Sequence, residues 1–276
     1  MQWFREGLRD SGYVEGKNLA FEFRHADTRD RLRAAAGELI RSRVDVVVTA
    51  GDLGALAAQQ STPTIPIVAL AGDLVGLGLA SSVARPGKNL TGVTIFGPEL
   101  NAKRLALLKE LVPDLSRVAL LWSAADRSQL EAAEEAARTL SIKLQILEVK
   151  TRTELPAVFE AVKRERAEAI NVLPSPLLFS FHPVILEHAA RERLPTVFHW
   201  KEAAEAGGLV SYGPSLASMW RQMGGVVAKV LKGANPATLP IEQATQFELV
   251  INLKTAKALG LNVPQRVLVR ADKLID

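Results

Sequence analysis

Two short segments of this sequence end in the same three residues, and both have the composition of a ligand-binding turn. They are VDVVVTAGD, residues 44–52, and IPIVALAGD, residues 65–73. Each run of β-branched and small apolar residues predicts a buried strand that stops at Ala-Gly-Asp. A strand that ends at glycine and leads into a helix presents unpaired backbone N–H groups, which favour anions. The ligand-binding residues predicted here are Thr49, Ala50, Gly51, Asp52, Ala71, Gly72 and Asp73.

The aspartates of these turns have a second role open to them. Asp52 or Thr49 can cap the helix expected after the first turn, and Asp73 can cap the one expected after the second. Helix capping and ligand contact are compatible roles, so both are predicted.

Four other predicted strands end in aromatic and small polar residues. The segments are VALLWS, INVLPSP, TVFHW and GLVSYG. Ligands bind beyond the carboxyl ends of parallel strands, and four such ends together favour the lining of a cleft. The alternative for each aromatic side chain is a place in the core. The ligand-binding residues predicted here are Trp122, Ser123, Ser175, Pro176, Trp200 and Tyr212.

The sequence contains no catalytic or metal-binding motif. It has no Cys, which excludes disulfides, thiolate catalysis and zinc-thiolate sites. The four His are scattered without an H-E-x-x-H motif, and neither a P-loop nor a G-x-S-x-G elbow occurs. The segment GLGLAS, residues 76–81, only loosely echoes a dinucleotide fingerprint, because it does not directly follow a strand. We therefore predict no catalytic residue, no metal and no cofactor.

The composition indicates a globular protein without a nucleic-acid surface or a membrane span. Hydrophobic residues make up 48% of the chain, and the net charge is +4 with the basic residues scattered. Only 5% of the residues are aromatic, so no platform of interleaved basic and aromatic side chains for nucleic acid is visible. No apolar window of about 18 residues lacks a charge. The start, MQWFREGLRD, is typical of an amphipathic helix rather than a signal peptide.

The predicted elements that must position these residues alternate between strands and helices. Such alternation is typical of parallel βαβ units, and their number favours two doubly wound lobes over one sheet. The predicted strands are 18–24, 44–49, 65–70, 91–96, 117–122, 142–148, 168–173, 195–199, 208–212 and 247–252. The predicted helices are 2–12, 29–42, 52–60, 74–84, 98–112, 127–140, 152–165, 177–193, 215–232 and 254–259.

Several long blocks of the sequence carry a family likeness. They include FREGLRDSGYVEGKNLAFEFR, ARPGKNLTG, EAGGLVSYGPSL and FELVINLKTAKALG, and they extend from about residue 2 to the C-terminus. The chain resembles substrate-binding proteins of ABC transporters, in the group often described as tryptophan/tyrosine-type.

This resemblance implies a type I periplasmic-binding-protein fold, an α/β architecture of two doubly wound parallel-sheet lobes joined by a three-crossing hinge. The crossings would lie near 95–98, 212–215 and 240–246. The lobes would be 1–96 plus 214–242 for lobe 1, and 97–213 plus 243–276 for lobe 2. The lobes would close on a small-molecule ligand that bears a carboxylate and is aromatic or amino-acid-like. An ABC permease and its ATPase would be the partners, at the periplasm or the cell surface.

The chain departs from the family pattern at both strand-end regions. The family usually reads G-x-P-A and G-D-P-V where this chain has Gly51-Asp52-Leu53 and Gly72-Asp73-Leu74, which affects the geometry of the turns. Ser123-Ala124 stands where Asn-Pro is common, which affects an amide contact and the specificity for amino acids.

A further departure concerns the first strand of lobe 1, which precedes the helix at 2–12 in family members together with an export signal. Neither is present in this sequence. We expect one of two outcomes. Lobe 1 closes up or borrows a strand, giving a homodimer paired at strand 18–24 or 44–49. Alternatively, the natural protein begins upstream.

Two other classes of protein fit the same alternation of elements. A ligand-sensing effector domain of a regulator shares the two-lobed fold, although no helix-turn-helix precedes this chain. A cytosolic α/β enzyme that uses a nucleotide would need a nucleotide site.

Overall fold

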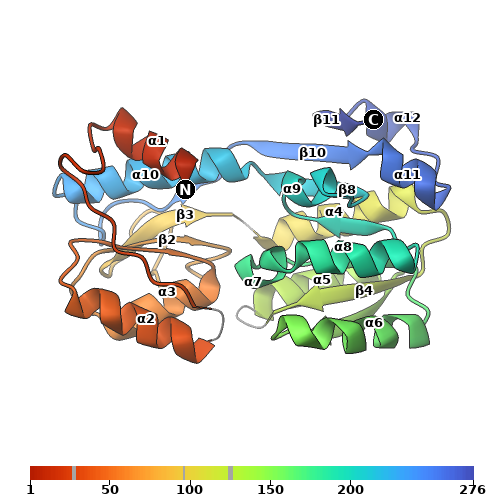
Figure 1. Ribbon diagram of the computed structural model, residues 1–276, viewed down its shortest axis with the longest axis horizontal. Helices are drawn as coiled ribbons and strands as arrows, with labels where there is room; N and C mark the ends of the chain where they lie inside the picture. Colours follow the sequence, from red (N-terminus) through yellow and green to blue (C-terminus); the bar gives the residue numbers. More distant parts are fainter. Residues whose placement is uncertain (27–28, 96, 124–126) are drawn as a thin grey trace. The chain divides into compact units, whose positions relative to one another are not determined.

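The computed structural model of the 276-residue chain describes all residues except 27–28, 96 and 124–126. The chain divides into two compact units (Figure 1). Unit 1 comprises Met1–Phe96 and Leu216–Thr245, and unit 2 comprises Gly97–Ser215 and Gln246–Asp276. The chain therefore passes between the units three times. The second and third passages fall at 215/216 and 245/246, against 213/214 and 242/243 in the sequence-based division.

Unit 1 contains a parallel sheet whose strands are short and apolar. Its order is β1-β2-β3-β9, with β1 at Val47–Ala50, β2 at Ile67–Ala71, β3 at Leu90–Thr94 and β9 at Glu242–Gln243. Every residue of β2 and β3 is buried, as expected for parallel strands covered on both faces. The helices of this unit are α1 (Gln2–Asp10), α2 (Arg29–Arg41), α3 (Asp52–Ser61) and α10 (Leu216–Leu231).

Helix α1 is held against α10 by a close backbone approach. A side chain at Gly7 would place its Cβ 2.0 Å from the carbonyl oxygen of Arg221, and one at Gly224 would place it 2.5 Å from that of Phe4. Only glycine at both positions lets the two helices cross this closely. Phe4 packs edge-on against Trp220 at 5.9 Å between ring centroids, so the N-terminal helix is anchored on a chain segment more than two hundred residues away.

Two predicted elements of unit 1 are wrong. Residues 20–26 form no strand among the described residues, and the preceding loop makes only an isolated bridge between Glu15 and Leu19. The alternation of Leu19, Phe21 and Phe23 indicates a strand, but a strand forms only beside a partner that accepts its hydrogen bonds. The predicted helix at 74–84 is a series of turns, because glycines at 76 and 78 disfavour a helix there.

Unit 2 contains a larger sheet in the order β11-β10-β8-β7-β6-β4-β5. Strands β8, β7, β6, β4 and β5 are parallel, as predicted, and β10 runs antiparallel to β8 toward the edge of the sheet. The strand bounds are β4 Arg117–Trp122, β5 Lys143–Glu148, β6 Ala169–Val172, β7 Thr196–Phe198, β8 Val210–Pro214, β10 Phe247–Asn252 and β11 Lys273–Ile275.

Helices cover both faces of the unit 2 sheet, and alternate strand residues pack toward opposite faces. In β6, Ala169 packs with Leu105 and Leu108 of α4, whereas Ile170 and Val172 pack toward α6 and α8. The predicted helix at 177–193 is broken into α7 and α8, and α9 was not predicted. The helix bounds are α4 Gly97–Leu111, α5 Arg127–Thr139, α6 Leu155–Arg164, α7 Pro176–Ser180, α8 His182–Arg191, α9 Lys201–Glu205, α11 Leu253–Leu259 and α12 Gln265–Leu268.

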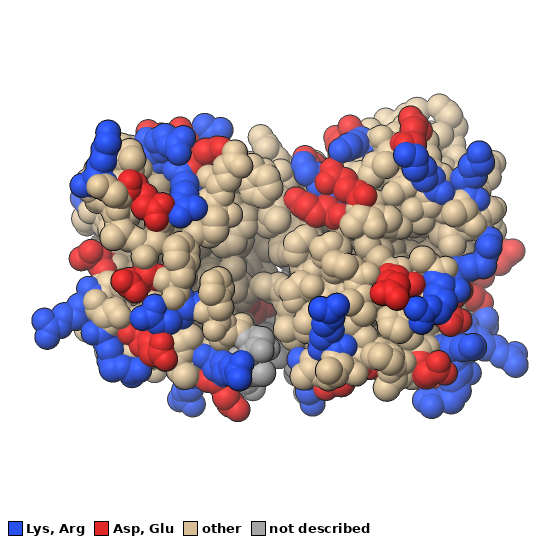
Figure 2. All heavy atoms as spheres, viewed as in Figure 1, with Lys and Arg blue, Asp and Glu red and all other residues tan. Residues whose placement is uncertain are grey.

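The charged side chains are mixed in sign on the face that Figure 2 shows. Lys and Arg alternate with Asp and Glu over both units, without a broad patch of one sign. A nucleic-acid surface would need basic side chains gathered on one face. Within the described part of the chain, no helix has the length and apolar character needed to cross a membrane.

Candidate functional site

The two Ala-Gly-Asp segments lie side by side at the carboxyl edge of the unit 1 sheet. They end the adjacent strands β1 and β2, whose register pairs Ala50 with Leu70. The N–H of Gly51 donates to the carbonyl of Leu70 at 2.7 Å, so the pairing continues into the turn. All seven residues predicted in unit 1, from Thr49 to Asp52 and from Ala71 to Asp73, are therefore brought together at one edge.

Asp52 ties the two turns to each other. The N–H of Gly72 donates to Oδ1 of Asp52 at 2.8 Å, and the hydroxyl of Thr94 donates to the carbonyl of Gly72 at 2.7 Å. The second turn is thus fixed on both sides, by the first turn and by β3. The prediction that Asp52 or Thr49 caps α3 is wrong, because the N-cap residue is Gly51 and no side chain caps this helix.

Helix α3 begins directly at the first turn and presents its N-terminus at this edge of the sheet. Gly51 has φ of 82°, a backbone conformation that favours glycine. The first N–H groups of a helix have no partner within the helix, and the helix dipole places partial positive charge there. The N-terminus of α3 therefore offers N–H groups to an anionic group, although the carboxylate of Asp52 in its first turn offsets the helix dipole.

Asp73 stabilises its own turn instead of a helix. Its Oδ1 accepts hydrogen bonds from the N–H groups of Val75 at 3.0 Å and Gly76 at 2.9 Å. An aspartate that binds the backbone two and three residues ahead favours a turn over a helix. No helix begins at this turn, so it offers no helix N-terminus to an anionic group. At this edge of unit 1, α3 is therefore the helix whose N-terminus can bind such a group.

The six residues predicted in unit 2 lie along one edge of its sheet. Strands β8, β7, β6 and β4 are consecutive neighbours and parallel, so their carboxyl ends are adjacent. Trp122 ends β4 and Ser123 follows it directly, and the predicted turn extends to Ala124, which lies outside the described residues. The remaining members of the set are Ser175, Pro176, Trp200 and Tyr212.

The aromatic residues of this edge differ in how far they are buried. Trp200 is only 8% exposed and packs edge-on against Phe179 of α7 at 4.6 Å, with the ring of His199 at 4.1 Å. Trp122 and Tyr212 are half-buried and pack against the core between the sheet and α4. Trp200 is therefore largely a core residue of unit 2, whereas Trp122 and Tyr212 retain accessible surface.

Ser175 has a structural role in the same region. Its side chain occupies the N-cap of α7 and accepts a hydrogen bond from the N–H of Leu178 at 3.4 Å. Pro176 follows at the first helical position, where its fixed φ suits the start of a helix and its missing N–H costs nothing. These two residues shape the loop after β6.

A group of buried polar side chains behind this edge was not predicted. Arg104 of α4 is fully buried and donates from Nη1 to the carbonyl of Tyr212 at 3.1 Å and from Nη2 to Oδ1 of Asn101. Asn171, inside β6, is fully buried, and neither of its side-chain polar atoms has a hydrogen-bond partner in the part of the chain that the structure describes. One feature of the sequence could have indicated this buried polar group: Asn171 is a polar residue inside the apolar run INVL.

His199 belongs to the same group and is neutral. The residue is 1% exposed, and neither ring nitrogen has a hydrogen bond of normal geometry among the described residues, although the backbone of Val172 lies near enough to favour the protonated ring. Burial first, and the positive charge of Arg104 second, lower the pKa of His199 well below 6.5. Burial also lowers the pKa of Arg104 to about 9, which leaves the guanidinium charged at neutral pH.

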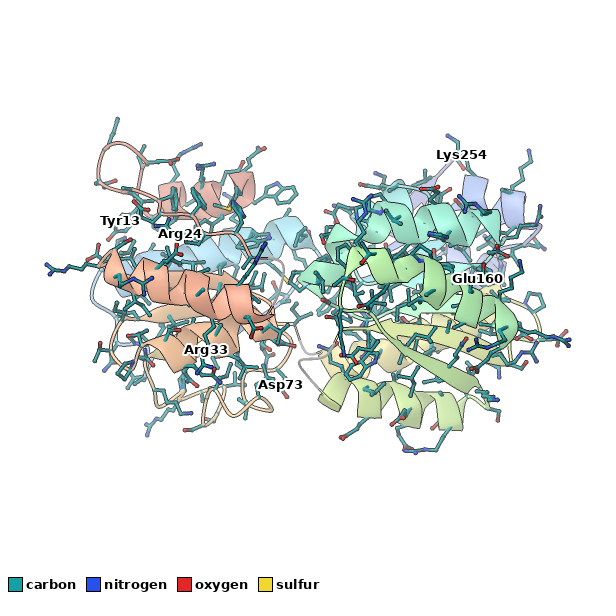
Figure 3. All side chains as sticks on the ribbon, turned by 60° about the horizontal axis from the view of Figure 1, so that its bottom comes forward. Tyr13, Arg24, Arg33, Asp73, Glu160 and Lys254 are labelled. Atoms are coloured by element: carbon teal, nitrogen blue, oxygen red, sulfur yellow. The ribbon has the colours of Figure 1, made fainter. Side chains whose placement is uncertain are left out.

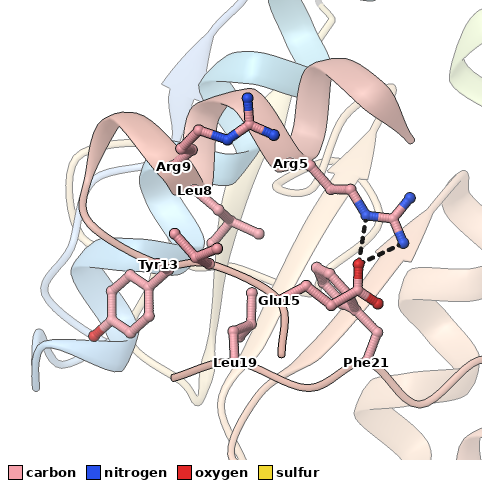
Figure 4. Close-up of a pocket in the computed structure, with 8 residues that line it drawn as sticks. Arg5, Leu8, Arg9, Tyr13, Glu15, Leu19 and Phe21 are labelled. Carbon is pink, nitrogen blue, oxygen red and sulfur yellow. Dashed lines mark hydrogen bonds and ion pairs between the residues drawn. The ribbon is translucent and has the colours of Figure 1, made fainter. Parts of the chain in front are cut away.

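A separate pocket of about 230 Å³ lies beneath α1 in unit 1 (Figure 4). Arg5 and Glu15, which line it, form an ion pair at 2.8 Å, and Tyr13 lines it as well. In Figure 3, Tyr13 and Asp73 lie at different ends of unit 1. None of the residues predicted to bind ligand lines this pocket. Within the described ranges, no group of three His, Cys, Asp or Glu residues is placed to hold a metal ion.

The fold and the two strand-end edges define the class of protein. Two α/β units built on parallel sheets and joined by three passages of the chain constitute the type I periplasmic-binding-protein fold. The model of the family described as "ABC transporter substrate binding protein" matches residues 1–275, and the chain belongs to this family.

The chain is also similar to individual relatives and solved structures. A tyrosine-binding protein of Clostridioides difficile is 23% identical over 264 residues, which cover 94% of this chain and 75% of the relative. A conserved domain protein of Vibrio cholerae has a crystal structure with a TM-score of 0.92 and 27% identity, covering 99% of this chain and 93% of the other. An ABC domain from Streptococcus pneumoniae, solved in complex with L-Trp, has a TM-score of 0.90 and 23% identity with the same coverage.

Proposed function

We propose that this protein is the solute-binding component of an ABC importer and that it captures a small aromatic amino acid or a related carboxylate. The observation that carries the proposal is the pair of strand-end turns in unit 1, tied together by Asp52 beside the N-terminus of α3. Two relatives support the choice of ligand, since one is a tyrosine-binding protein and another was solved with L-Trp.

The ligand would be held by parts of both units. Its carboxylate would lie at the N-terminus of α3, and its apolar part against the accessible surfaces of Trp122 and Tyr212. Ser123 and the loop shaped by Ser175 and Pro176 would complete the unit 2 side. Closure of the hinge would then select the state in which both units contact the ligand.

The magnitudes are compatible with binding in the micromolar range, which requires about −8 kcal/mol. A helix N-terminus contributes about 0.3–2 kcal/mol toward an anion. Each aromatic pair adds about 0.5–1.5 kcal/mol beyond its buried area. Burial of the apolar part of the ligand, at about 25 cal/mol per Å², must supply most of the remainder.

We further propose that the protein does not transform its ligand and that it passes the ligand to a membrane permease with an associated ATPase. Membership of a family of substrate-binding proteins supports both statements. Among the described residues, the two strand-end edges present backbone amides, small side chains and aromatic surface, which suit solute binding, and no nucleophile there is paired with a base. The place of action would be the periplasm or the cell surface.

A homodimer through unit 1 is a second part of the proposal. Among the described residues, β1 is the edge strand of its sheet, and Val48, Thr49 and Ala50 are only half-buried although the strand is apolar. An open apolar edge favours pairing with another strand. Static light scattering of the purified chain tests this, and a monomer at all concentrations would refute the dimer.

Calorimetry of the purified protein against L-Trp, L-Tyr, aliphatic amino acids and aromatic acids tests the function. We expect saturable binding of an aromatic amino acid at one site per chain. Mass spectrometry of the recovered ligand is the second readout, and a covalently altered product would refute the proposal that the protein is not an enzyme.

A further inference from the structure

The largest fully buried side chain among the described residues is a cation, Arg104. Its two printed hydrogen bonds go to neutral acceptors, the carbonyl of Tyr212 and the amide oxygen of Asn101. No carboxylate among the described residues pairs with it, and Nε has no partner. A charged side chain is almost never fully buried unless an opposite charge compensates it, because burial of an unpaired charge is costly.

The surroundings of Arg104 do not compensate its charge either. His199 lies close enough to Arg104 for the guanidinium charge to lower its pKa, and neither ring nitrogen has a hydrogen bond of normal geometry among the described residues. Asn171 also has two unpartnered side-chain atoms and lies on the sheet face that packs against α4, as its alternation with Ile170 and Val172 indicates. Buried polar atoms without partners are rare, and each needs an explanation.

These atoms lie directly behind the edge of unit 2 that would receive the ligand. Arg104 reaches the backbone of β8 at Tyr212, and His199 follows β7 immediately before Trp200. Long side chains on a helix point toward its N-terminus, and here Arg104 bonds to Asn101 one turn earlier. The charge is therefore held toward the carboxyl ends of β7 and β8.

We propose that Arg104 serves charge selection: its uncompensated positive charge favours a bound ligand that carries an anionic group. The inference rests on the proposed function and adds the chemistry that unit 2 recognises. Arg104 acts without contact, because its positive charge in the protein interior is screened less than a surface charge. The carboxylate of the bound ligand supplies the opposite charge that the described protein groups do not.

The test compares L-tryptophan with L-tryptophan amide, which differ at the carboxylate and keep the ring and the amino group. Calorimetry is run on the wild-type protein and on Arg104→Met, which keeps the length of the apolar stem and removes the charge. We expect Arg104→Met to weaken binding of the acid about tenfold and binding of the amide less than about threefold. Equal losses for the two ligands would assign Arg104 to packing and overturn the inference.

Two controls protect the comparison. Asn101→Ala removes a hydrogen-bond acceptor of Arg104 and keeps its charge, so the preference for the acid should persist; its loss would contradict the inference. If Arg104→Met does not fold, as judged by circular dichroism, the wild-type preference is measured at low and at high salt. A buried charge predicts that the preference survives high salt, and its disappearance would overturn the inference. A wild-type protein that binds neither ligand would refute the proposed function itself, and this inference with it.

Discussion

Replacement of Asp52 by alanine should loosen both strand-end turns and weaken ligand binding together. The carboxylate accepts a hydrogen bond at 2.8 Å from the N–H of Gly72, which is buried. Removal of one partner leaves a buried donor unsatisfied, which costs about 1–3 kcal/mol. For a domain of this size, about 2 kcal/mol lowers the Tm by about 4–8 °C. The same change separates the second turn from the N-terminus of α3, so we expect the Kd for an aromatic amino acid to rise as well.

Matched variants make this prediction specific. Asp52→Asn keeps an oxygen in place for the Gly72 N–H and should recover most of the stability. Asp73→Ala removes only the bonds within the second turn, to Val75 and Gly76, and should weaken binding less. Differential scanning calorimetry and isothermal titration calorimetry give the two quantities. An Asp52→Ala protein with unchanged Tm and unchanged Kd would refute the role of Asp52 as the link between the turns.

Three further outcomes are expected. Trp200→Ala should cost about 3–5 kcal/mol of unfolding free energy, because Trp200 is a buried core residue, while Tyr212→Ala should mainly weaken ligand binding; chemical denaturation compares the two, and a neutral Trp200→Ala would contradict the packing. Burial raises the pKa of Glu168, but the N–H groups of Ser116 and Arg117 more than offset it, and the net pKa is lowered. Its stabilisation is therefore present above the unfolded-state pKa and lost as the pH falls through the folded-state pKa. The stability difference between wild type and Glu168→Gln should be constant near pH 7 and shrink below about pH 4; urea titrations that give a constant difference down to pH 3 would refute this. His199 has a lowered pKa, so the unfolded state binds the proton first and stability should decline as the pH falls below about 6.5, a decline that His199→Gln removes.

The strands that lie inside the sheets could be predicted from the sequence because burial on both faces leaves a simple pattern. The run RVALLW predicted 117–122 and forms β4 over those residues, and the runs at 65–70 and 168–173 predicted β2 and β6 within about two residues. The hydrophobic pattern does not predict a strand correctly where the strand forms, or takes its direction, only through pairing with a neighbouring strand. Residues 18–24 alternate correctly but have no partner strand among the described residues. The direction of β10 is also set by pairing and not by its own residues.

In the candidate site, the positions of the residues could be predicted from the sequence, whereas their individual roles could not. Strand-end positions follow from the order of the elements, so the predicted residues fall on two edges, one in each unit. Their individual roles depend on contacts between distant segments. The bond from Gly72 to Asp52 joins residues twenty apart, and the bond from Arg104 to Tyr212 joins residues more than one hundred apart. No local sequence pattern indicates such contacts. For this reason Arg104 and His199 were not predicted as part of the site.

The most direct test of the account is equilibrium binding by the purified chain, measured together with the fate of the ligand. The protein is titrated with L-Trp and with L-Tyr in a calorimeter, and the ligand is then recovered and analysed by mass spectrometry. The account predicts saturable binding of at least one of them and full recovery of the unchanged amino acid. Absence of binding to both, or a chemically altered product, would contradict it.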